Sequence, residues 1–565
     1  MSKSTNLEPK TCIRYNETVH YLTFLENALK QYWDRPCLNN YHGETLTFSD
    51  VAKLIAKFHL AFEQVGIEKG DKIALCAKNT NRWGVSFLSV FTYEAVIVPI
   101  LADFHPDSVC HLVTHSESKI LFTDKDIWSK LDISKMPTIS TVICTEDFSL
   151  LYTSDEKVKE IYQELPTLFE SRYPMGFSRE NVQYNTTGNI DNLAIINYTS
   201  GTTSDPKGVM LTYRNISASV TYAQNMVPSK PGYSIVSMLP MAHIYGLVFE
   251  FLYPICGGAS IYFLGRTPSP SVLLKAMKEI KPYLVLCVPL VMEKVYKSAV
   301  KPMLSKTAIK ILYNTPLLNR IVYKKVREGL DNAFGGQVQE YIMGGAALNP
   351  EVEKCFRRIG LHYMVGYGLT EAAPLLGYAH WYDYAKGSCG KAVACSSVRI
   401  DSEDPQHIAG EIQAKGENLC IGYYKNEDAT KAAFTDDGYF RTGDLGIIDS
   451  KGNIYIKGRI KNMFLSANGQ NIYPEEIEAV VNSQPYVAES VVVNRSGRIV
   501  GLVYLDSEGI KKSGLDEEAI ADIPENIKNA SNKQLPLYSQ IAKVEVVMEP
   551  FQKTPKMSIK RFLYK

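Results

Sequence analysis

The sequence lacks the features of several protein classes. Its 61 Lys and Arg residues balance 60 Asp and Glu residues, so the formal net charge is only +1. Such a chain has no general attraction for nucleic acid or for an anionic lipid surface, and any anion site must be local. The first residues lack the apolar run of a secretory signal, and apolar stretches such as 284–292 fall well short of the ~18 residues that a membrane span needs. We therefore expect a cytoplasmic protein that does not bind nucleic acid.

Paired cysteines are also missing. The eleven cysteines include no C-x-x-C pair and no other spacing that is typical of partners. An odd number of cysteines cannot form a complete disulfide framework, and zinc sites need closely spaced ligand pairs. The sequence therefore predicts buried thiols in a reducing compartment, with neither disulfides nor a structural zinc.

The chain does have enough apolar material for several domains. Its 565 residues correspond to about three to four domain-sized units, and 45% hydrophobic with 21% charged residues is typical of a folded globular protein. Continuous apolar runs such as 72–76 and 95–100 alternate with segments of helical periodicity, as in βα units. We predict an α/β protein in which helices cover parallel sheets.

The pattern changes after residue 444. Residues 446–456 predict a β-hairpin around Ser-Lys-Gly-Asn, and we place a domain boundary near Lys461. The following segment of about 100 residues is the size of one small domain. It contains a predicted helix that begins near Pro474 and predicted strands over 490–494 and 499–505. The predicted domains are 1–459 and 460–565.

An amphipathic helix is predicted around residues 316–330, with Thr315 as its N-cap and Pro316 at its first position. The residues of its apolar side are Leu317, Leu318, Ile321, Val322 and Val326. Such a helix can rest on a membrane surface, but a packed helix with a solvated basic face is the commoner structure for this pattern.

The segment 198–208, with the sequence YTSGTTSDPKG, carries the strongest chemical signal. It follows the apolar run 193–196 and precedes a helical pattern from Asn215, which predicts a loop at the end of a strand. Backbone N–H groups and small hydroxyl side chains can surround a phosphate, and Lys207 adds a positive charge. The loop is not a Walker A motif, because Gly208 follows the lysine instead of preceding it. Its composition predicts a phosphate-binding loop, although a polar surface loop would explain this segment if it stood alone.

Six further motifs follow in a fixed order. They are LPMAHIYG at 239–246, GGAAL at 344–348, GYGLTE at 366–371, YFRTGDL at 439–445, GRIK at 458–461 and NGQNIYPEEIE at 468–478. With the loop, they resemble the acyl-adenylate-forming superfamily, which contains acyl-CoA synthetases, peptide-synthetase adenylation domains and beetle luciferases. The resemblance extends over nearly the whole chain. Each motif alone has a real false-positive rate, whereas a chance match of all of them in order is negligible.

The resemblance implies a fold and a reaction. The fold is α/β, with a large N-terminal region of βα-layered subdomains that includes a distorted barrel, and a small mobile α+β C-terminal domain. In the reaction, a carboxylate attacks the α-phosphate of ATP to give acyl-AMP and pyrophosphate, and the thiol of CoA then attacks the acyl-AMP. Two anions must meet in the first step, and a unit charge pair about 4 Å apart is worth roughly 4 kcal/mol at an effective dielectric near 20. The implied cofactor is Mg²⁺, with ATP and CoA as co-substrates.

The resemblance assigns most of the site residues to ATP. It implies that Glu371 holds Mg²⁺ and that Thr370 donates to the α-phosphate. Asp444 would accept from both ribose hydroxyls, and Arg459 would reach the ribose or a phosphate. The other residues implied to contact ATP are Thr199, Ser200, Gly201, Thr202, Thr203, Lys207, Gly345, Ala346, Tyr367 and Gly368.

The resemblance also places the acyl group and CoA. His243 and Tyr245 would border the acyl carboxylate together with Gly345, and His243 is implied to be catalytic. Lys461 takes the hinge position and is also implied to act in catalysis. Gly469 lies on the loop that the resemblance places beside the pantetheine channel.

Two segments, 288–296 and 367–374, are most similar to those of long-chain fatty-acid–CoA ligases, and no carrier-protein segment is appended. The implied substrates are therefore a fatty acid, ATP and CoA. Long-chain substrates partition into lipid, so any membrane contact is expected to be peripheral.

Two positions depart from the family pattern. Ser204 replaces the usual glycine of the phosphate loop, where a serine can still donate to phosphate. Ser558 occupies the position of the catalytic lysine in the C-terminal motif Thr-x-x-Gly-Lys-Ile. Loss of a group that stabilises transition-state charge costs ~3–4 kcal/mol. We expect weak adenylation with thiol transfer retained, unless Lys556 or Lys560 supplies the charge.

Two alternatives stay open at this point. One is a catalytically deficient acyl- or nucleotide-binding protein, which Ser558 favours. The other is a ligase for a different acid, either an aryl or a medium-chain one.

Overall fold

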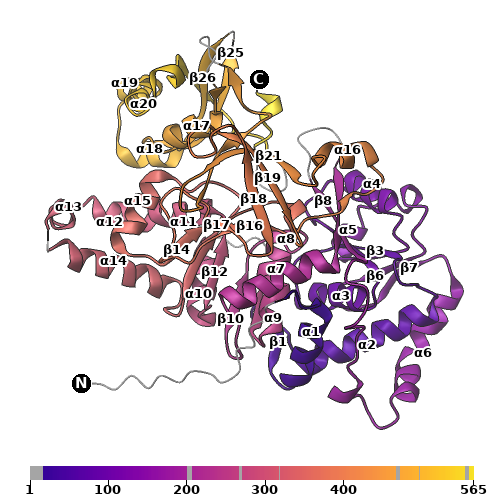
Figure 1. The fold of residues 1–565 in the computed structure, drawn as a ribbon. Helices are drawn as coiled ribbons and strands as arrows, with labels where there is room; N and C mark the ends of the chain where they lie inside the picture. Colours follow the sequence, from indigo (N-terminus) through magenta and orange to yellow (C-terminus); the bar gives the residue numbers. More distant parts are fainter. Residues whose placement is uncertain are drawn as a thin grey trace.

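The computed structural model describes residues 17–199, 206–265, 270–316, 318–465, 471–495, 497–553 and 559–564. Figure 1 shows a large body of sheets and helices, with a smaller unit of strands and helices from the C-terminal part of the chain above it. The predicted α/β class, with a large N-terminal region and a small C-terminal unit, is confirmed. None of the described helices is long and apolar enough to cross a bilayer.

The largest sheet has the order β20-β9-β8-β4-β3-β5-β6-β7. Its strands are β3 (Lys72–Cys76), β4 (Val96–Ile100), β5 (Ile120–Thr123), β6 (Thr141–Cys144), β7 (Leu150–Thr153), β8 (Leu193–Thr199), β9 (Lys207–Thr212) and β20 (Gly422–Tyr423). The five central strands run parallel, and the outer pairings of β7, β9 and β20 are antiparallel. The two apolar runs predicted as strands of a parallel sheet are β3 and β4.

Helices cover this sheet because their apolar stripes face it. In α2 (Phe48–Gln64), a capping box between Thr47 and Asp50 fixes the first turn, and Val51, Ile55 and Phe58 are buried. The neighbouring helices are α1 (Tyr21–Gln31), α3 (Asn81–Thr92), α4 (Pro106–Ser116), α5 (Lys125–Trp128) and α6 (Glu156–Arg172).

Two further sheets and several helices complete the centre of the body. The strands are β1 (Pro36–Asn40), β2 (Thr45–Thr47), β10 (Ser234–Ser237) and β11 (Ser260–Phe263) in one sheet, and β12 (Leu284–Cys287), β13 (Glu340–Met343) and β14 (Tyr363–Val365) in a parallel sheet. The helices are α7 (Tyr213–Met226), α8 (Ile244–Gly246), a π-helical segment (Leu247–Leu252), α9 (Tyr253–Cys256), α10 (Pro270–Ile280), α11 (Pro289–Val295), α12 (Lys301–Leu304), α13 (Thr307–Asn314), α14 (Asn319–Ala333) and α15 (Pro350–Ile359).

The rest of the large body is mostly antiparallel. Its elements are β15 (Tyr367–Gly368), β16 (Leu375–Tyr378), β17 (Lys391–Ala392), β18 (Ser396–Asp401), β19 (Gly410–Gly416), α16 (Glu427–Ala433), β21 (Phe440–Ile448) and β22 (Ile454–Arg459). The predicted hairpin at 446–456 is confirmed, because Ile448 pairs with Ile454 and the Asp449 N–H donates to the Asn453 carbonyl at 3.0 Å.

The helix predicted around 316–330 begins later than expected. Thr315 ends α13, where its hydroxyl donates to the Ile311 carbonyl at 2.7 Å, and α14 begins at Asn319. The residue before a proline is disfavoured in helical conformation, so Pro316 ends α13 instead of starting α14. Val322 is buried as predicted, whereas Ile321 is 59% exposed. Leu318 is also exposed, and Leu317 lies outside the described residues, so the buried stripe is narrower than the sequence suggested.

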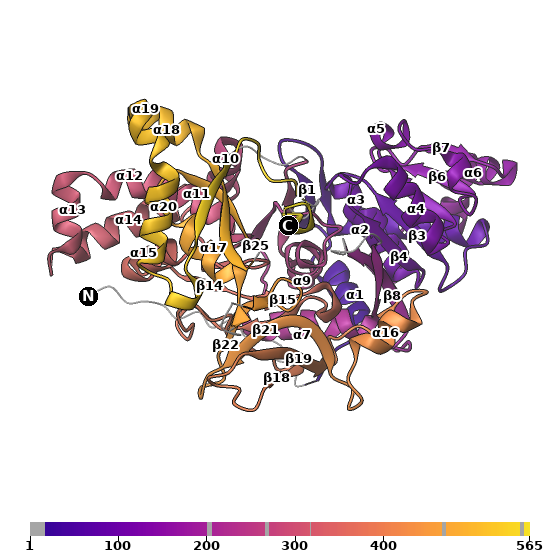
Figure 2. The same cartoon turned by 90° about the horizontal axis from the view of Figure 1, so that it is seen from above.

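The C-terminal unit has a hydrophobic cluster of its own. Its elements are β23 (Phe464–Leu465), β24 (Asn471–Ile472), α17 (Pro474–Asn482), β25 (Val487–Arg495), β26 (Arg498–Leu505), α18 (Ser507–Ser513), α19 (Glu517–Ala521), α20 (Ile523–Asn532) and β27 (Lys543–Val547). The helix predicted from Pro474 and both predicted strands are present. Figure 2 shows the unit on the side of the large body that carries α11 and α15, and Lys297 Nζ donates to the Val487 carbonyl at 3.5 Å. The division at 459/460 and the mobility of this unit stay predictions.

Candidate functional site

The predicted phosphate loop joins β8 to β9. Thr199 pairs with Lys207 across the two strands, so both described ends of the loop lie together. The predicted contacts Ser200, Gly201, Thr202 and Thr203 lie outside the described residues, as does Ser204. The loop does not lead directly into the helix, because β9 intervenes and α7 begins at Tyr213 after its N-cap, Thr212.

Tyr423 brings a cation and a carboxylate of the predicted site together. Lys207 Nζ lies 4.8 Å from the centre of the Tyr423 ring, and the Tyr423 hydroxyl donates to Glu371 Oε1 at 3.0 Å. The ring is buried, and Glu371 is half-buried. Tyr423 therefore contacts Lys207, the lysine predicted to bind phosphate, through its ring. Its hydroxyl bonds Glu371, the predicted metal ligand.

The turn around Glu371 is fixed by backbone contacts. Thr370 is buried in the same single turn of 3₁₀ helix, and the Glu371 carbonyl accepts from the Cys420 N–H at 2.7 Å. A side chain at Gly368 would place its Cβ 1.9 Å from the Pro374 carbonyl oxygen, so this position accepts only glycine. The tightly packed backbone of this turn therefore fixes the position from which the Glu371 side chain extends.

Asp444 lies between two side chains that the sequence assigned to the same nucleotide. Arg459 Nε is 2.6 Å from Asp444 Oδ1, and the Tyr367 hydroxyl donates to Asp444 Oδ2 at 2.7 Å. The aspartate is buried and the arginine is more than half exposed. Burial raises the pKa of Asp444, and the Arg459 charge opposes that rise. The three predicted residues therefore form one polar cluster.

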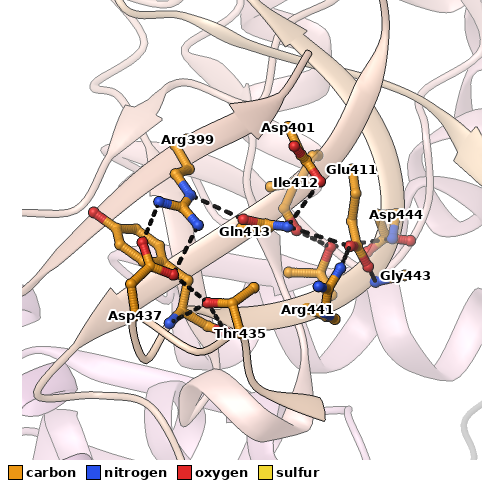
Figure 3. Close-up of polar contacts among 12 residues, drawn as sticks. Arg399, Asp401, Glu411, Ile412, Gln413, Thr435, Asp437, Arg441, Gly443 and Asp444 are labelled. Carbon is orange, nitrogen blue, oxygen red and sulfur yellow. Dashed lines mark hydrogen bonds and ion pairs between the residues drawn. The ribbon is translucent and has the colours of Figure 1, made fainter. Parts of the chain in front are cut away.

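A polar network on the adjoining sheet supports the turn before Asp444 (Figure 3). Glu411 Oε1 accepts from the Gly443 N–H at 3.2 Å, and Glu411 also pairs with Arg441 at 3.0 Å. Gln413 is 1% exposed, donates to Glu411 at 3.4 Å and accepts from Arg399 at 2.8 Å. Gly443 has a φ of +70°, a backbone conformation that favours glycine, and it directly precedes Asp444. The network therefore holds the turn that positions the Asp444 carboxylate.

An apolar cavity of about 110 Å³ begins next to these residues. Its lining includes the backbone of Gly344, Gly345 and Gly368 with the ring of Tyr367, and the side chains of Tyr222, Met226, Tyr253 and Tyr378. His243 and Tyr245 also line it. Residues from three separate motifs therefore meet in one cavity.

The two predicted carboxylate neighbours are oriented differently. His243 Nδ1 accepts from the Tyr245 N–H at 3.3 Å, which in the neutral ring leaves the proton on Nε2. The Tyr245 hydroxyl donates to the Ile342 carbonyl at 3.1 Å, so its proton is already engaged within the protein. Of the two side chains, His243 is the one with a polar atom suited to a carboxylate.

The remaining predicted residues lie at the edges of the cluster or beyond it. Ala346 is exposed next to Gly345, and Lys461 is exposed in the turn after β22. Gly469 and Ser558 lie outside the described residues, as does Lys556. The chain on either side of Ser558 is paired, because Lys553 bridges to Ile559 and the Lys560 N–H donates to the Gln552 carbonyl at 2.8 Å.

Sequence reasoning missed a buried carboxyl beside the 239–246 motif. Glu250 is fully buried in the π-helical segment and accepts from the Met238 N–H at 3.1 Å and the Leu239 N–H at 3.0 Å. Burial raises the pKa of Glu250 to about 8. The sequence signal that could have revealed Glu250 is an acidic residue within an apolar run. Tyr423 and Gln413 were also missed, and no local pattern marks either of them.

Two family models together match most of the chain. The family described as AMP-binding enzyme matches residues 25–424, and the family described as AMP-binding enzyme C-terminal domain matches residues 461–564. Long-chain-fatty-acid–CoA ligase 1 of Saccharomyces cerevisiae is 27% identical, over 89% of this chain and 78% of that protein. The chloroplastic long-chain-fatty-acid–[acyl-carrier-protein] ligase AEE15 of Arabidopsis thaliana is 26% identical, over 99% of this chain and 87% of that protein.

A solved structure has the same fold. The o-succinylbenzoate CoA synthetase of Bacillus subtilis, in complex with its acyl-adenylate intermediate, has a TM-score of 0.73 at 20% identity, over 98% of this chain and 99% of that chain. The same enzyme has also been solved with ATP and a magnesium ion. The family match spans most of the chain, from the first helix to the strand that carries Tyr423. The chain therefore belongs to the AMP-binding enzyme family and is an adenylate-forming acid–thiol ligase.

Proposed function

We propose that this chain joins a long-chain fatty acid to CoA at the expense of ATP. In the first step a carboxylate oxygen attacks the α-phosphorus, the bond to pyrophosphate breaks, and fatty acyl-AMP forms. In the second step the sulfur of CoA attacks the acyl carbon, the bond to AMP breaks, and the thiol proton is lost. The observation that carries the proposal is the apolar cavity that ends beside the cluster of Tyr367 and Asp444.

The lining of the cavity favours an acid with one charge. No Lys, Arg, Asp or Glu is among the described residues that line it. A second charged group on the substrate would be buried there without a partner, which is costly. Two of the lining tyrosine hydroxyls bond protein groups: Tyr378 donates to Glu340 at 2.7 Å, and Tyr253 donates to the Val227 carbonyl. The substrate tail would therefore contact aromatic and aliphatic faces.

The carboxylate end would meet ATP where the cavity borders Tyr367 and its partner Asp444. In this proposal Asp444 accepts from the ribose hydroxyls, Lys207 and Thr199 neighbour the phosphates, and His243 donates to the acyl carboxylate. These groups bind and orient the two anions so that the attacking oxygen faces the α-phosphorus. Lys461 would serve the hinge movement between the two steps, as the resemblance to the family implies.

The residues around Glu371 fit a magnesium ion. A half-buried carboxylate beside the buried hydroxyl of Thr370 offers the hard oxygen donors that Mg²⁺ prefers. Bound there, the ion would neutralise phosphate charge. The part played by the chain is to hold the Glu371 carboxylate, which the Tyr423 hydroxyl and the backbone contact of Cys420 keep in place.

A second candidate is a ligase for a medium-chain or aryl acid. The cavity volume of about 110 Å³ and its tyrosine lining favour it, because a flat ring stacks well on aromatic faces. The long-chain relatives favour the first candidate. Either acid would use the same adenylate chemistry.

A panel of carboxylic acids separates these candidates. Pyrophosphate release is measured with Mg-ATP and straight-chain acids of increasing length, aryl acids and dicarboxylic acids, with Glu371→Gln as the inactive control. We expect the highest kcat/KM for long-chain acids and no release with dicarboxylic acids. A maximum for aryl or medium-chain acids replaces the first candidate with the second. Acid binding without pyrophosphate release from any acid would indicate a catalytically deficient binding protein.

A further inference from the structure

One stretch of the chain is strongly basic although the whole chain is nearly neutral. Residues 294–327 contain nine basic residues and no Asp or Glu, against a net charge of +1 for all 565 residues. The nine are Lys294, Lys297, Lys301, Lys306, Lys310, Arg320, Lys324, Lys325 and Arg327. This stretch lies between β12 and β13 and comprises the end of α11, a π-helical segment (Tyr296–Val300), α12, α13 and the first part of α14. It creates a local positive field that the composition alone does not reveal.

The same stretch exposes large apolar side chains. The exposed fractions are 63% for Ile311, 38% for Leu312, 46% for Leu318 and 59% for Ile321. They come from α13, from the connection after it and from the first turn of α14. Figures 1 and 2 both place α13 at the outer edge of the large body. We call these four side chains, with the basic residues Lys306, Arg320 and Lys325 beside them in sequence, the α13–α14 surface.

The exposed side chains are not needed to hold the two helices together. Tyr313 and Tyr323 pack edge to face at 5.1 Å between ring centres, and the Tyr323 hydroxyl donates to the Tyr313 carbonyl at 3.2 Å. Val322, Val326 and Leu330 are buried on the inner side of α14. The core therefore uses one face of this helix pair and leaves a second apolar face in contact with water.

The three basic residues of the α13–α14 surface, Lys306, Arg320 and Lys325, make no ion pair in the part of the chain that the structure describes. Their neighbour Lys324 reaches Glu328 at 3.8 Å. Such basic side chains complement the negative headgroup charges of an anionic phospholipid surface. The exposed aliphatic side chains beside them complement its acyl chains.

We propose that the α13–α14 surface docks the protein on an anionic phospholipid membrane. Ile311, Leu312, Leu318 and Ile321 enter the boundary between headgroups and acyl chains, and Lys306, Arg320 and Lys325 face the lipid charges. Each contribution alone gives weak binding, and the two together give a stable but reversible attachment.

A membrane explains this surface better than a second copy of the chain. A symmetric dimer through the same face would bring two identical basic stretches together, and like charges across an interface are repulsive. The surface also belongs to the segment that connects β12 to β13, and these strands supply Leu284, Leu286, Ile342 and Met343 to the cavity wall. The docking itself does not depend on the proposed substrate.

Sedimentation with vesicles tests the proposal on the full chain, without ATP, CoA or acid, so its outcome is independent of the proposed reaction. Vesicles of phosphatidylcholine alone are compared with vesicles of phosphatidylcholine and phosphatidylserine in equal amounts. We expect binding to the mixed vesicles, weaker binding to phosphatidylcholine alone, and loss of binding at high salt. Absence of binding to the mixed vesicles, or equal binding to both, would overturn the proposal.

Two double variants separate the apolar and basic contributions. The pairs Ile311→Ser with Ile321→Ser, and Arg320→Gln with Lys325→Gln, are each expected to lower the partition coefficient about tenfold or more. Matched controls elsewhere on the surface are Ile408→Ser, which replaces a side chain that is 55% exposed, and Lys130→Gln with Lys157→Gln. The controls should bind like the unchanged chain. Unchanged binding of both double variants, or a concentration-dependent dimer in sedimentation velocity that Ile321→Ser dissociates, would show that this face does not serve a membrane.

Discussion

Arg459 Nε lies 2.6 Å from Asp444 Oδ1, and the other carboxylate oxygen accepts from a tyrosine hydroxyl. Both oxygens that the ribose hydroxyls would use are therefore engaged before ATP binds. In the proposed site, ribose would have to share Asp444 with Arg459 or displace it. This arginine is the last residue of β22, two residues before Lys461, so the exchange would take place directly beside the predicted hinge.

Asp444→Asn should weaken ATP binding strongly. The variant keeps the shape of the side chain, but it loses the charge that holds Arg459 and accepts from ribose. A hydrogen bond to a charged group is worth about 1.5–3 kcal/mol, so the Kd for ATP should rise roughly 10- to 100-fold. Titration calorimetry measures the change, with the exposed Asp436→Asn as the control. An unchanged Kd would remove Asp444 from the ATP site.

Gln413→Leu should weaken ATP binding indirectly, through the residues that hold the turn before Asp444. The glutamine touches neither the predicted nucleotide nor Asp444, but it joins Arg399 to Glu411, which accepts from the Gly443 N–H. Loss of this link costs roughly 1 kcal/mol at the turn before Asp444, which corresponds to about a fivefold higher Kd for ATP. Gln413→Glu keeps the acceptor for Arg399 but replaces the donor to Glu411 with a carboxylate, so it should also weaken ATP binding. An unchanged Kd for ATP in both variants would contradict this role of Gln413.

Glu250 gives the fold a specific dependence on pH. Its pKa is raised from the ordinary 4.5 to about 8, so the folded state holds a proton there that the unfolded chain releases. Stability from this group is fully present below about pH 4.5 and is lost as the pH rises to about 8. Glu250→Gln should therefore flatten the decline of the urea midpoint between about pH 5 and about pH 8. The exposed Glu170→Gln is the control, and a slope identical to that of the unchanged chain would contradict the assignment.

Ser558→Lys should speed the first half-reaction. The lysine would restore the positive group that the family pattern places against the carboxylate and the α-phosphate. We expect acyl-AMP formation to rise about tenfold or more, with the rate of thiol transfer from acyl-AMP unchanged. Single-turnover assays of each half-reaction separate the two effects, and Ser558→Ala controls for the loss of the hydroxyl. No acceleration would mean that Lys556 or Lys560 already supplies the charge.

The sequence predicted the interior strands well and one helix start poorly. Strands β3 and β4 are central in a parallel sheet and buried on both faces, so their apolar runs mark them clearly. The start of α14 was placed too early, because Pro316 is as compatible with the end of one helix as with the beginning of the next. Strand β9 was not predicted, because its first two residues, Lys207 and Gly208, are also the last two residues of the loop motif.

Only those residues of the candidate site that belong to the ordered sequence motifs were predicted. Asp444, Tyr367 and Arg459 come from three motifs and meet in space. The contacts of Tyr423 and Gln413 could not be foreseen, because Tyr423 bonds a residue 52 positions away and Gln413 acts through the sheet. Such contacts depend on the packing of distant segments, and a single sequence contains no periodicity that reports them.

A split assay of thioester formation measures the two half-reactions of the proposed ligase separately. One reaction contains the purified protein, a long-chain fatty acid, Mg-ATP and CoA, and the other contains presynthesised long-chain acyl-AMP and CoA. Acyl-CoA is quantified in both by mass spectrometry. We expect acyl-CoA in both reactions, with slower formation from the free acid because Ser558 occupies the lysine position. Absence of acyl-CoA from both reactions would contradict the assignment of this chain as a long-chain fatty-acid–CoA ligase.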